Sequence, residues 1–121
     1  MKGGMMFDQK DIVLIHFPYT DFSVSKKRPA LIISNEKENK MQDRICCLIT
    51  TSPHKEDLAI EKDFFEDGKL PFKSFIKPHR IFTIHEGIII KKLCTIKNEL
   101  YAKVVEKINE VIKSSKSQKS L

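Results

Sequence analysis

The sequence predicts a small, mainly β barrel with one α-helix packed on it near the C-terminus. Two observations predict this class. Short apolar runs rich in β-branched residues alternate with polar or proline-containing turns between residues 11 and 95. The period then changes, and apolar residues recur at helical spacing from Leu100 to Ile112. Several short strands followed by one helix favour a barrel with the helix against it.

The first three strands are expected at residues 11–17, 30–34 and 44–50. The run from Asp11 to Phe17 is apolar and stops at Pro18, which indicates a strand buried on both faces. The polar segment 19–27 is long for a hairpin loop. Arg28-Pro29 closes it, because proline fixes its own φ and favours an extended residue before it. Residues 35–43 predict a loop with room for one helical turn.

Shorter elements follow in the second half of the chain. Strands are expected at 58–61, 74–77, 80–84 and 88–95, with Pro78 ending the second of them. Asp67-Gly68 and Pro71 predict irregular structure between residues 64 and 72. Asn98 is the expected N-cap of the helix. The length fits a single domain, residues 1–121, ordered from about 8 to 113 and flexible at 1–6 and 114–121.

Composition and charge narrow the possible functions. The formal net charge is +6, of which the tail from residue 113 onward contributes three lysines and no acid. This balance favours an anionic partner such as nucleic acid without proving one. Three cysteines, two of them adjacent at Cys46 and Cys47, make a poor disulfide framework and predict buried thiols in a reducing compartment. No metal-ligand spacing, signal peptide or membrane-length apolar run is present in the sequence, so we expect no metal, no cofactor, no membrane and a cytoplasmic location.

Four motifs occur in a fixed order along the chain. They are Asp11-Ile-Val-Leu-Ile-His-Phe-Pro18, a polar basic loop, the run Lys27-Arg28-Pro29-Ala30-Leu31-Ile32-Ile33-Ser34-Asn35, and Leu48-Ile49-Thr50-Thr51-Ser52. In this order the chain resembles the MazF/PemK family of toxin endoribonucleases, over roughly residues 10–112. The likeness continues in Leu70-Pro71, Ile81-Phe82-Thr83-Ile84 and Lys91-Lys92-Leu93.

The resemblance implies both a fold and a reaction. The fold would be an SH3-like barrel of the MazF, PemK and CcdB type that forms a homodimer. The protein would be the toxin of a type II toxin–antitoxin pair, with a cognate antitoxin peptide as partner. Its substrate would be single-stranded RNA, chiefly mRNA. Cleavage would need no metal and would proceed by attack of a ribose 2′-hydroxyl on the adjacent phosphate.

The same resemblance implies that Arg28 and Thr50 form the central catalytic pair. The chemistry suits them, because a guanidinium stays charged and can hold two phosphate oxygens, and a hydroxyl can donate to a third. Arg28 is a poor base, so the 2′-hydroxyl needs another group to take its proton. The candidates are His16, Asp21 and His79. We favour His79, because it stands where some family members have a carboxylate and the pKa of an ordinary histidine lies near neutrality.

Several further residues are predicted to bind RNA. Lys26 and Lys27 flank Arg28 and would attract backbone phosphates, although such lysines are more often a solvated surface. Tyr19 and Phe22 would stack on bases or else anchor the loop. Lys77 would contact a phosphate as a point charge.

The chain departs from the family pattern near this last site. Lys77 and His79 stand where some members have an arginine and an aspartate, and Phe82 stands where such members have an arginine. His79 could replace the carboxylate as base, or the base could be lost. The alternative function is therefore a catalytically degenerate module that binds RNA or an antitoxin on the same fold.

Overall fold

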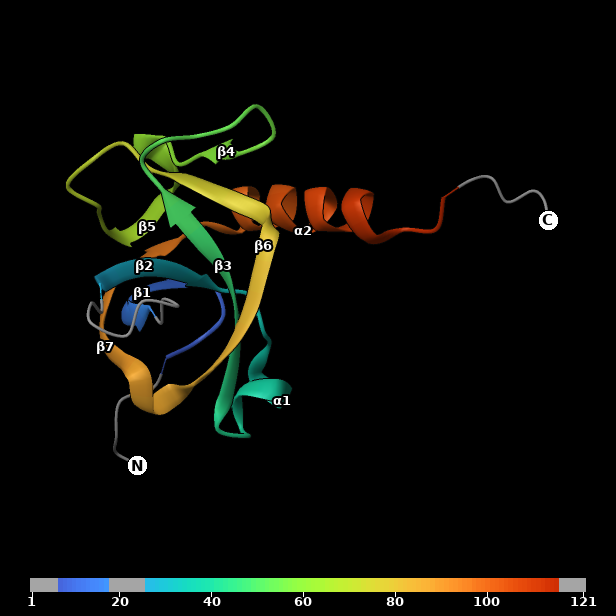
Figure 1. Cartoon of the computed structure of the whole chain (residues 1–121). Helices are drawn as coiled ribbons and strands as arrows, with labels where there is room; N and C mark the ends of the chain where they lie inside the picture. Colours follow the sequence, from blue (N-terminus) through green and yellow to red (C-terminus); the bar gives the residue numbers. More distant parts are fainter. Residues whose placement is uncertain (1–6, 18–25, 116–121) are drawn as a thin grey trace.

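The computed structural model describes residues 7–17 and 26–115, and an antiparallel sheet of seven strands dominates them (Figure 1). The strands lie side by side in the order β4-β6-β3-β2-β1-β7-β5. Their bounds are β1 Asp11–Phe17, β2 Lys26–Ile32, β3 Asp43–Thr50, β4 Leu58–Ala59, β5 Phe65–Gly68, β6 Phe75–His85 and β7 Ile89–Ile96. Two α-helices, α1 Glu36–Asn39 and α2 Asn98–Ile112, and two short 3-10 helices, η1 Lys62–Phe64 and η2 Glu86–Ile88, complete the described part of the chain. The sheet curls strongly, so the predicted class, a mainly β barrel-like fold with a terminal helix, is confirmed.

Both faces of the central strands are buried, as the apolar runs predict. Ile12 of β1 belongs to one apolar cluster, which also contains the first turns of α2, while Val13 and Ile15 belong to a second cluster on the other face. The adjacent thiols divide in the same way: Cys47 enters the first cluster and Cys46 the second, and neither is exposed. Successive strand residues point to opposite faces, so a continuous apolar run is what this curled sheet requires.

The strand β6 is continuous where the sequence predicts two strands separated by Pro78. Leu48 pairs with Lys77 and Cys47 pairs with Ile81, so residues 78–80 have no partner in β3. They form a bulge, and a proline is tolerated there because no ladder hydrogen bond is required of it. The bulge also bends β6 sharply (Figure 1).

Two further strands differ from the prediction. β2 begins at Lys26 rather than at Ala30, because Lys26, Lys27 and Arg28 pair with the end of β1. Residues 65–68, predicted to be irregular, form the edge strand β5 against β7. Gly68 has a φ of +72° there. The Asp67-Gly68 pair therefore does mark a change of backbone direction, but at the end of a strand that forms by pairing with β7.

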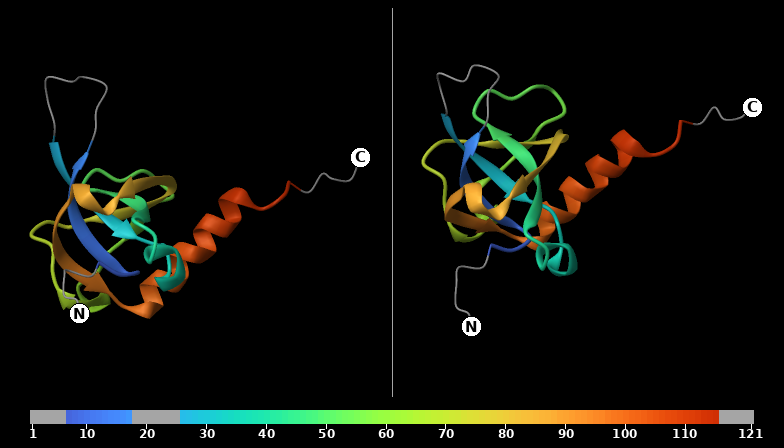
Figure 2. Two further views of the ribbon diagram at one scale, coloured as in Figure 1. Left: turned by 90° about the horizontal axis from the view of Figure 1, so that it is seen from below. Right: turned by 60° about the horizontal axis from the view of Figure 1, so that its bottom comes forward.

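Only the first part of α2 packs on the sheet. Leu100 and Val104 are buried, and the Tyr101 hydroxyl donates a hydrogen bond to the Ile33 carbonyl at 2.8 Å. Ile108 is half-buried and packs against the same core, whereas Val105, Val111 and Ile112 are exposed, with Ile112 at 67%, and the helix extends away from the sheet (Figure 2).

The predicted cap of α2 is wrong. Lys97 occupies the N-cap without a side-chain hydrogen bond, and Asn98 lies inside the helix. The Asn98 side-chain oxygen instead accepts a hydrogen bond from Lys10 Nζ at 2.7 Å. No helix among residues 7–17 and 26–115 is long and apolar enough to cross a membrane.

Candidate functional site

The strand register brings Arg28 and Thr50 to the same face of the sheet. β2 and β3 pair as Ala30 with Leu48 and Leu31 with Cys47. Continuing this register by two residues sets Arg28 opposite Thr50, just beyond the last paired residues. Residues opposite each other in an antiparallel pair share a face. The two residues, 22 positions apart in the sequence, therefore converge because of the sheet.

Both residues line one open groove of about 580 Å³. The lining consists of the start of β2, the end of β3 with the turn that follows it, and the residue before β6: Lys26, Lys27, Arg28, Pro29, Ile49, Thr50, Thr51, Ser52 and Ser74. Arg28 and Thr50 are half-buried, whereas Lys26 and Lys27 are exposed. Three of these described residues are cationic and none is acidic, so the groove attracts anions.

The hydroxyl of Thr50 is held in one orientation by its own turn. Thr50 Oγ1 accepts a hydrogen bond from the Ser52 N–H at 3.0 Å. Its approach to the Ser52 carbonyl, at 3.5 Å, is too long for a strong hydrogen bond. The oxygen is thus fixed by a backbone donor, while its proton remains available to an acceptor in the groove.

Pro29 helps to place Arg28. It lies where β2 pairs with β1 but not yet with β3, since the β2–β3 ladder begins at Ala30. A proline is compatible with a strand at such a position, because its missing N–H removes no bond to a second neighbour. Its ring also holds Arg28 in an extended conformation.

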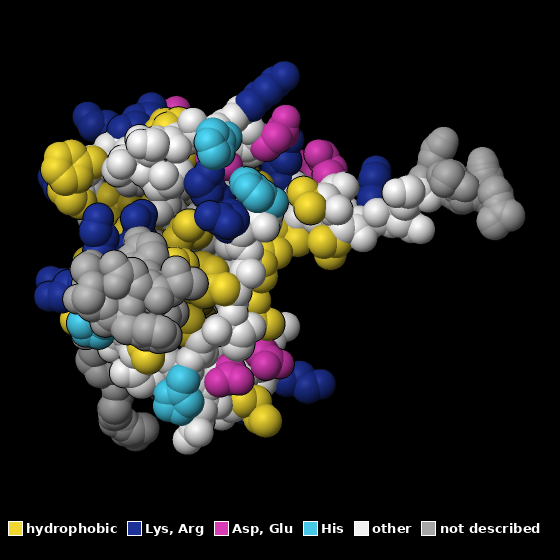
Figure 3. Space-filling model, in the orientation of Figure 1, with side chains coloured by type: hydrophobic (Ala, Val, Ile, Leu, Met, Phe, Trp, Pro, Cys, Tyr) yellow, Lys and Arg dark blue, Asp and Glu magenta, His cyan; other side chains and the backbone are white. Residues whose placement is uncertain are grey.

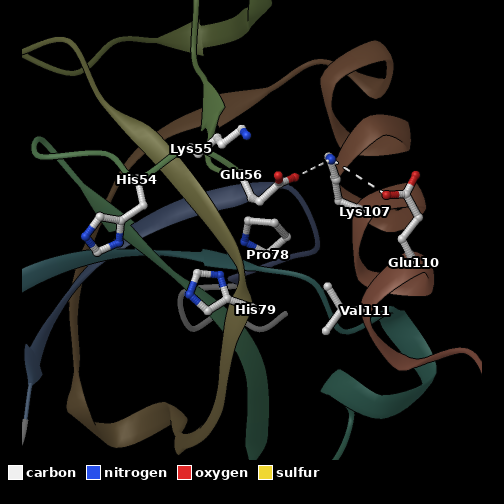
Figure 4. A pocket seen from close by; sticks show the side chains of 8 residues that line it. All are labelled: His54, Lys55, Glu56, Pro78, His79, Lys107, Glu110 and Val111. Carbon is white, nitrogen blue, oxygen red and sulfur yellow. Dashed lines mark hydrogen bonds and ion pairs between the residues drawn. The ribbon is translucent and has the colours of Figure 1, made fainter. Parts of the chain in front are cut away.

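His79 lies elsewhere, in a second cavity of about 460 Å³ (Figure 4). The wall of this cavity is formed by the β3–β4 loop, the β6 bulge and α2: His54, Lys55, Glu56, Pro78, His79, Lys107, Glu110 and Val111. Lys107 Nζ lies 2.8 Å from Glu56 and 3.6 Å from Glu110, so its charge is balanced within the wall. His79 is not among the residues that line the Arg28 groove.

Lys77 is buried rather than presented to solvent. Its Nζ lies 2.8 Å from Asp57 Oδ2 and 3.2 Å from His54 Nδ1. The side chain of Lys77 is 9% exposed and that of Asp57 is not exposed at all. This geometry disfavours the predicted phosphate contact of Lys77, because its ammonium is buried and already paired with a carboxylate.

The charge of Asp57 is stabilised locally in spite of its burial. Burial by itself would raise the pKa of Asp57. Hydrogen bonds from the Lys77 ammonium and the His54 N–H, together with the charges of Lys77 and His79, hold that pKa below its ordinary value. Asp57 Oδ1 is nevertheless a buried oxygen without a hydrogen-bond partner among the described residues.

On the face seen in Figure 3, two histidine side chains lie next to Lys and Arg side chains where β6 bends.

The other predicted residues divide between described and undescribed parts of the chain. His16 is exposed and pairs across the strands with Lys27. Tyr19, Asp21 and Phe22 lie outside the described residues.

Sequence reasoning missed three polar residues of the groove, Thr51, Ser52 and Ser74, and the partner of Lys77. Ser52 stands in the quoted Thr50-Thr51-Ser52 run, and its position two residues after Thr50 suits a side-chain turn. Ser74 and Asp57 carry no such signal, since each reaches its place through strand pairing with residues far away in the sequence.

The family model of PemK-like, MazF-like toxins of type II toxin–antitoxin systems matches residues 8–112. Sequence comparison with curated proteins finds no significant match. Among solved structures, the chain resembles an endoribonuclease in complex with its cognate antitoxin from a mycobacterial species, with a TM-score of 0.71 and 16% identity, over 87% of this chain and 93% of that one. It also resembles a MazE–MazF structure from Deinococcus radiodurans, with a TM-score of 0.72 and 15% identity, over 89% and 97%.

A third similar structure is the Mycobacterium tuberculosis toxin MazF-mt6, with a TM-score of 0.66 and 16% identity, over 83% of this chain and 93% of that one. At these identities the structures establish the fold, which agrees with the curled sheet and terminal helix described above. The family model spans β1 to the end of α2 and therefore includes Arg28, Thr50 and every strand that places them. The chain belongs to the family of PemK-like, MazF-like toxins of type II toxin–antitoxin systems.

Proposed function

We propose that the protein is a metal-independent endoribonuclease that cleaves single-stranded RNA in the Arg28 groove. The observation that carries this proposal is the convergence of Arg28 and Thr50 on one face of a groove lined by cations. Family membership supports it, and a similar structure is itself described as an endoribonuclease.

The reaction needs a site that stabilises negative charge at phosphorus. The ribose 2′-oxygen loses its proton and bonds to phosphorus, the bond from phosphorus to the 5′-oxygen breaks, and that oxygen takes up a proton. The products are a 2′,3′-cyclic phosphate and a 5′-hydroxyl. Arg28 would hold two phosphate oxygens, and the fixed hydroxyl of Thr50 would donate to one of them. Lys26 and Lys27 would attract the strand without reading its sequence.

The proposal is tested with a mixed-sequence single-stranded RNA in EDTA, followed by mapping of the cleaved ends. Arg28→Ala should lower the cleavage rate by roughly 10²- to 10³-fold, the usual effect of removing one preorganised donor. Arg28→Lys should retain part of the activity, because it keeps the charge but loses the two-point contact. Lys37→Ala, an exposed cation on α1, is the matched control and should cleave like the wild type. Equal cleavage by Arg28→Ala would refute the assignment.

A second function is favoured by one observation. The described residues that line the groove include no imidazole and no carboxylate, so the proton acceptor for the 2′-hydroxyl would have to come from outside that lining. A protein of this kind could bind RNA without cutting it. Salt-sensitive binding in EDTA with no cleaved product would establish this alternative.

The proposed partners are a cognate antitoxin and a second copy of the chain. One similar structure is a complex with its cognate antitoxin, and an acidic peptide would suit the cationic groove. The exposed Val105, Val111 and Ile112 of α2 offer an apolar surface for self-association. Light scattering of the purified chain, alone and with the antitoxin, measures both.

A further inference from the structure

Phe72 is the most exposed large apolar side chain that the structure describes, at 71%. Single exposed apolar residues are common and need no function. Phe72 differs because the loop that carries it is held on both sides and leads directly into the groove. Hydrophobic side chains protrude over the β5–β6 loop in Figure 3, with Lys and Arg side chains beside them.

Two anchors hold this loop while leaving the ring of Phe72 in solvent. Before it, Leu70 packs against the core cluster that lies under α2. After it, Ser74 is buried, and its hydroxyl donates a hydrogen bond to the Phe72 carbonyl at 2.8 Å. The intervening Pro71 restricts the backbone further. An aromatic ring held in water does not gain the free energy that its burial would give. Such exposure is expected of a ring that contacts a ligand.

The same anchor connects Phe72 to the proposed active site. Ser74 lines the Arg28 groove, and Phe75 is the cross-strand partner of Thr50. Phe72 precedes Phe75 by three residues, a span of at most about 10 Å along an extended chain. The loop that carries Phe72 therefore lies close to the end of the groove that holds Thr50.

Charge around the loop suits a nucleic-acid strand. Lys69 and Lys73 flank Leu70-Pro71-Phe72. Lys73 lies 3.1 Å from Glu61 in an exposed pair, which contributes little to stability. An exposed aromatic ring bordered by cations is the usual composition of a single-strand site, where bases stack on rings and phosphates meet lysines.

We propose that Phe72 is a stacking platform for a nucleobase of single-stranded RNA next to the phosphate held in the Arg28 groove. The inference rests on the proposed function, because it assigns the neighbouring base of the same substrate. Stacking tolerates any base, so Phe72 adds affinity and fixes the position of the strand rather than reading its sequence.

The test measures binding without cleavage. The probe is a mixed-sequence RNA oligonucleotide with 2′-O-methyl groups throughout, which lacks the attacking hydroxyl, and affinity is measured by anisotropy at fixed salt. Phe72→Ala should weaken binding roughly 5- to 150-fold, the range for loss of one stacked base. Met41→Ala removes a side chain that is 65% exposed on another loop and should bind like the wild type.

Phe72→Trp supplies a second, direct readout. The chain contains no tryptophan, so this variant carries a single reporter. It should restore the affinity, and its fluorescence should be quenched by the 2′-O-methyl RNA but not by the same backbone without bases. Binding by Phe72→Ala equal to that of the wild type would overturn the inference. So would a loss of affinity that accompanies a change of oligomeric state, because Phe72 would then be a protein contact.

Failure of the two proposals can be told apart. If the wild type binds the probe through Phe72 but cleaves no unmodified RNA, the endoribonuclease proposal fails and the stacking platform stands. If the wild type cleaves RNA and Phe72→Ala binds the probe unchanged, the stacking platform fails alone.

Discussion

Replacement of Lys77 by methionine tests the energetics of the buried ion pair. Lys77→Met keeps most of the side-chain volume but removes the ammonium 2.8 Å from Asp57 Oδ2. Among the described residues, the unexposed Asp57 carboxylate would then keep the His54 N–H as its one donor. Removing one partner of a buried pair costs about 3–5 kcal/mol. For a domain of this size the melting temperature should fall by roughly 10–20 °C.

The pH dependence of stability gives a second signature. The folded pKa of Asp57 is lowered, so its ionisation stabilises the wild type above the unfolded pKa of about 3.9. That contribution is lost as the pH falls through the lower folded value. In Lys77→Met the folded pKa of Asp57 should rise, because burial then acts without the ammonium. The difference in stability between wild type and variant should therefore shrink as the pH falls through the raised folded pKa of the variant toward the lower folded pKa of the wild type.

The assay is urea unfolding at pH 7 and at pH 4, and two further variants serve as controls. Lys73→Met breaks an exposed pair with Glu61 and should cost no more than about 1 kcal/mol. The double variant Asp57→Leu with Lys77→Met removes both charges and should recover the stability of the wild type or exceed it. If Lys77→Met costs as little as Lys73→Met, the pair is not desolvated and the reasoning is wrong.

Three other predictions follow from local geometry. Gly68→Ala should cost about 2 kcal/mol in urea unfolding, because a Cβ there would lie 2.8 Å from the Leu93 carbonyl at a φ of +72°; a change within 0.5 kcal/mol would contradict this. Burial raises the pKa of each thiol to about 12, so a disulfide reagent at pH 8 should label the native chain only as it unfolds. Rapid labelling of native protein would contradict the burial of Cys46, Cys47 and Cys94. Ile112→Lys should leave stability nearly unchanged and weaken self-association in light scattering; an unaltered dimer would remove the end of α2 from the interface.

The sequence predicts most of the strands but misjudges the role of its prolines. Pro78 reads as the end of a strand, whereas β6 continues through it because residues 78–80 bulge away from β3. Pro29 reads as the end of a loop, whereas it lies inside β2, where the strand has one neighbour. In both cases proline cannot donate a hydrogen bond to a neighbouring strand. Whether this ends the strand depends on whether a neighbouring strand is paired at that position.

The candidate site shows the same division. Motif order assigned Arg28 and Thr50 to one site, and the register of β2 and β3 supports their convergence on one groove. For Lys77 and His79, the sequence offers only their residue types and their positions in the family pattern. Their surroundings include Asp57 and His54, which reach them through the β3–β4 loop and no sequence signal. Burial and pairing of a charge depend on such long-range neighbours.

By itself, the sequence determined the mainly β class, the burial of both faces of β1 and the family, and it predicted the pair Arg28 and Thr50. These properties follow from short-range periodicity and from the order of motifs along the chain. Only the tertiary structure decided that Lys77 is paired with a carboxylate inside the protein, that His79 lines a different cavity, and that Phe72 is exposed on the loop that leads into the groove. The physical reason is that exposure and electrostatic partners are properties of packed neighbours, which strand register sets and local sequence does not.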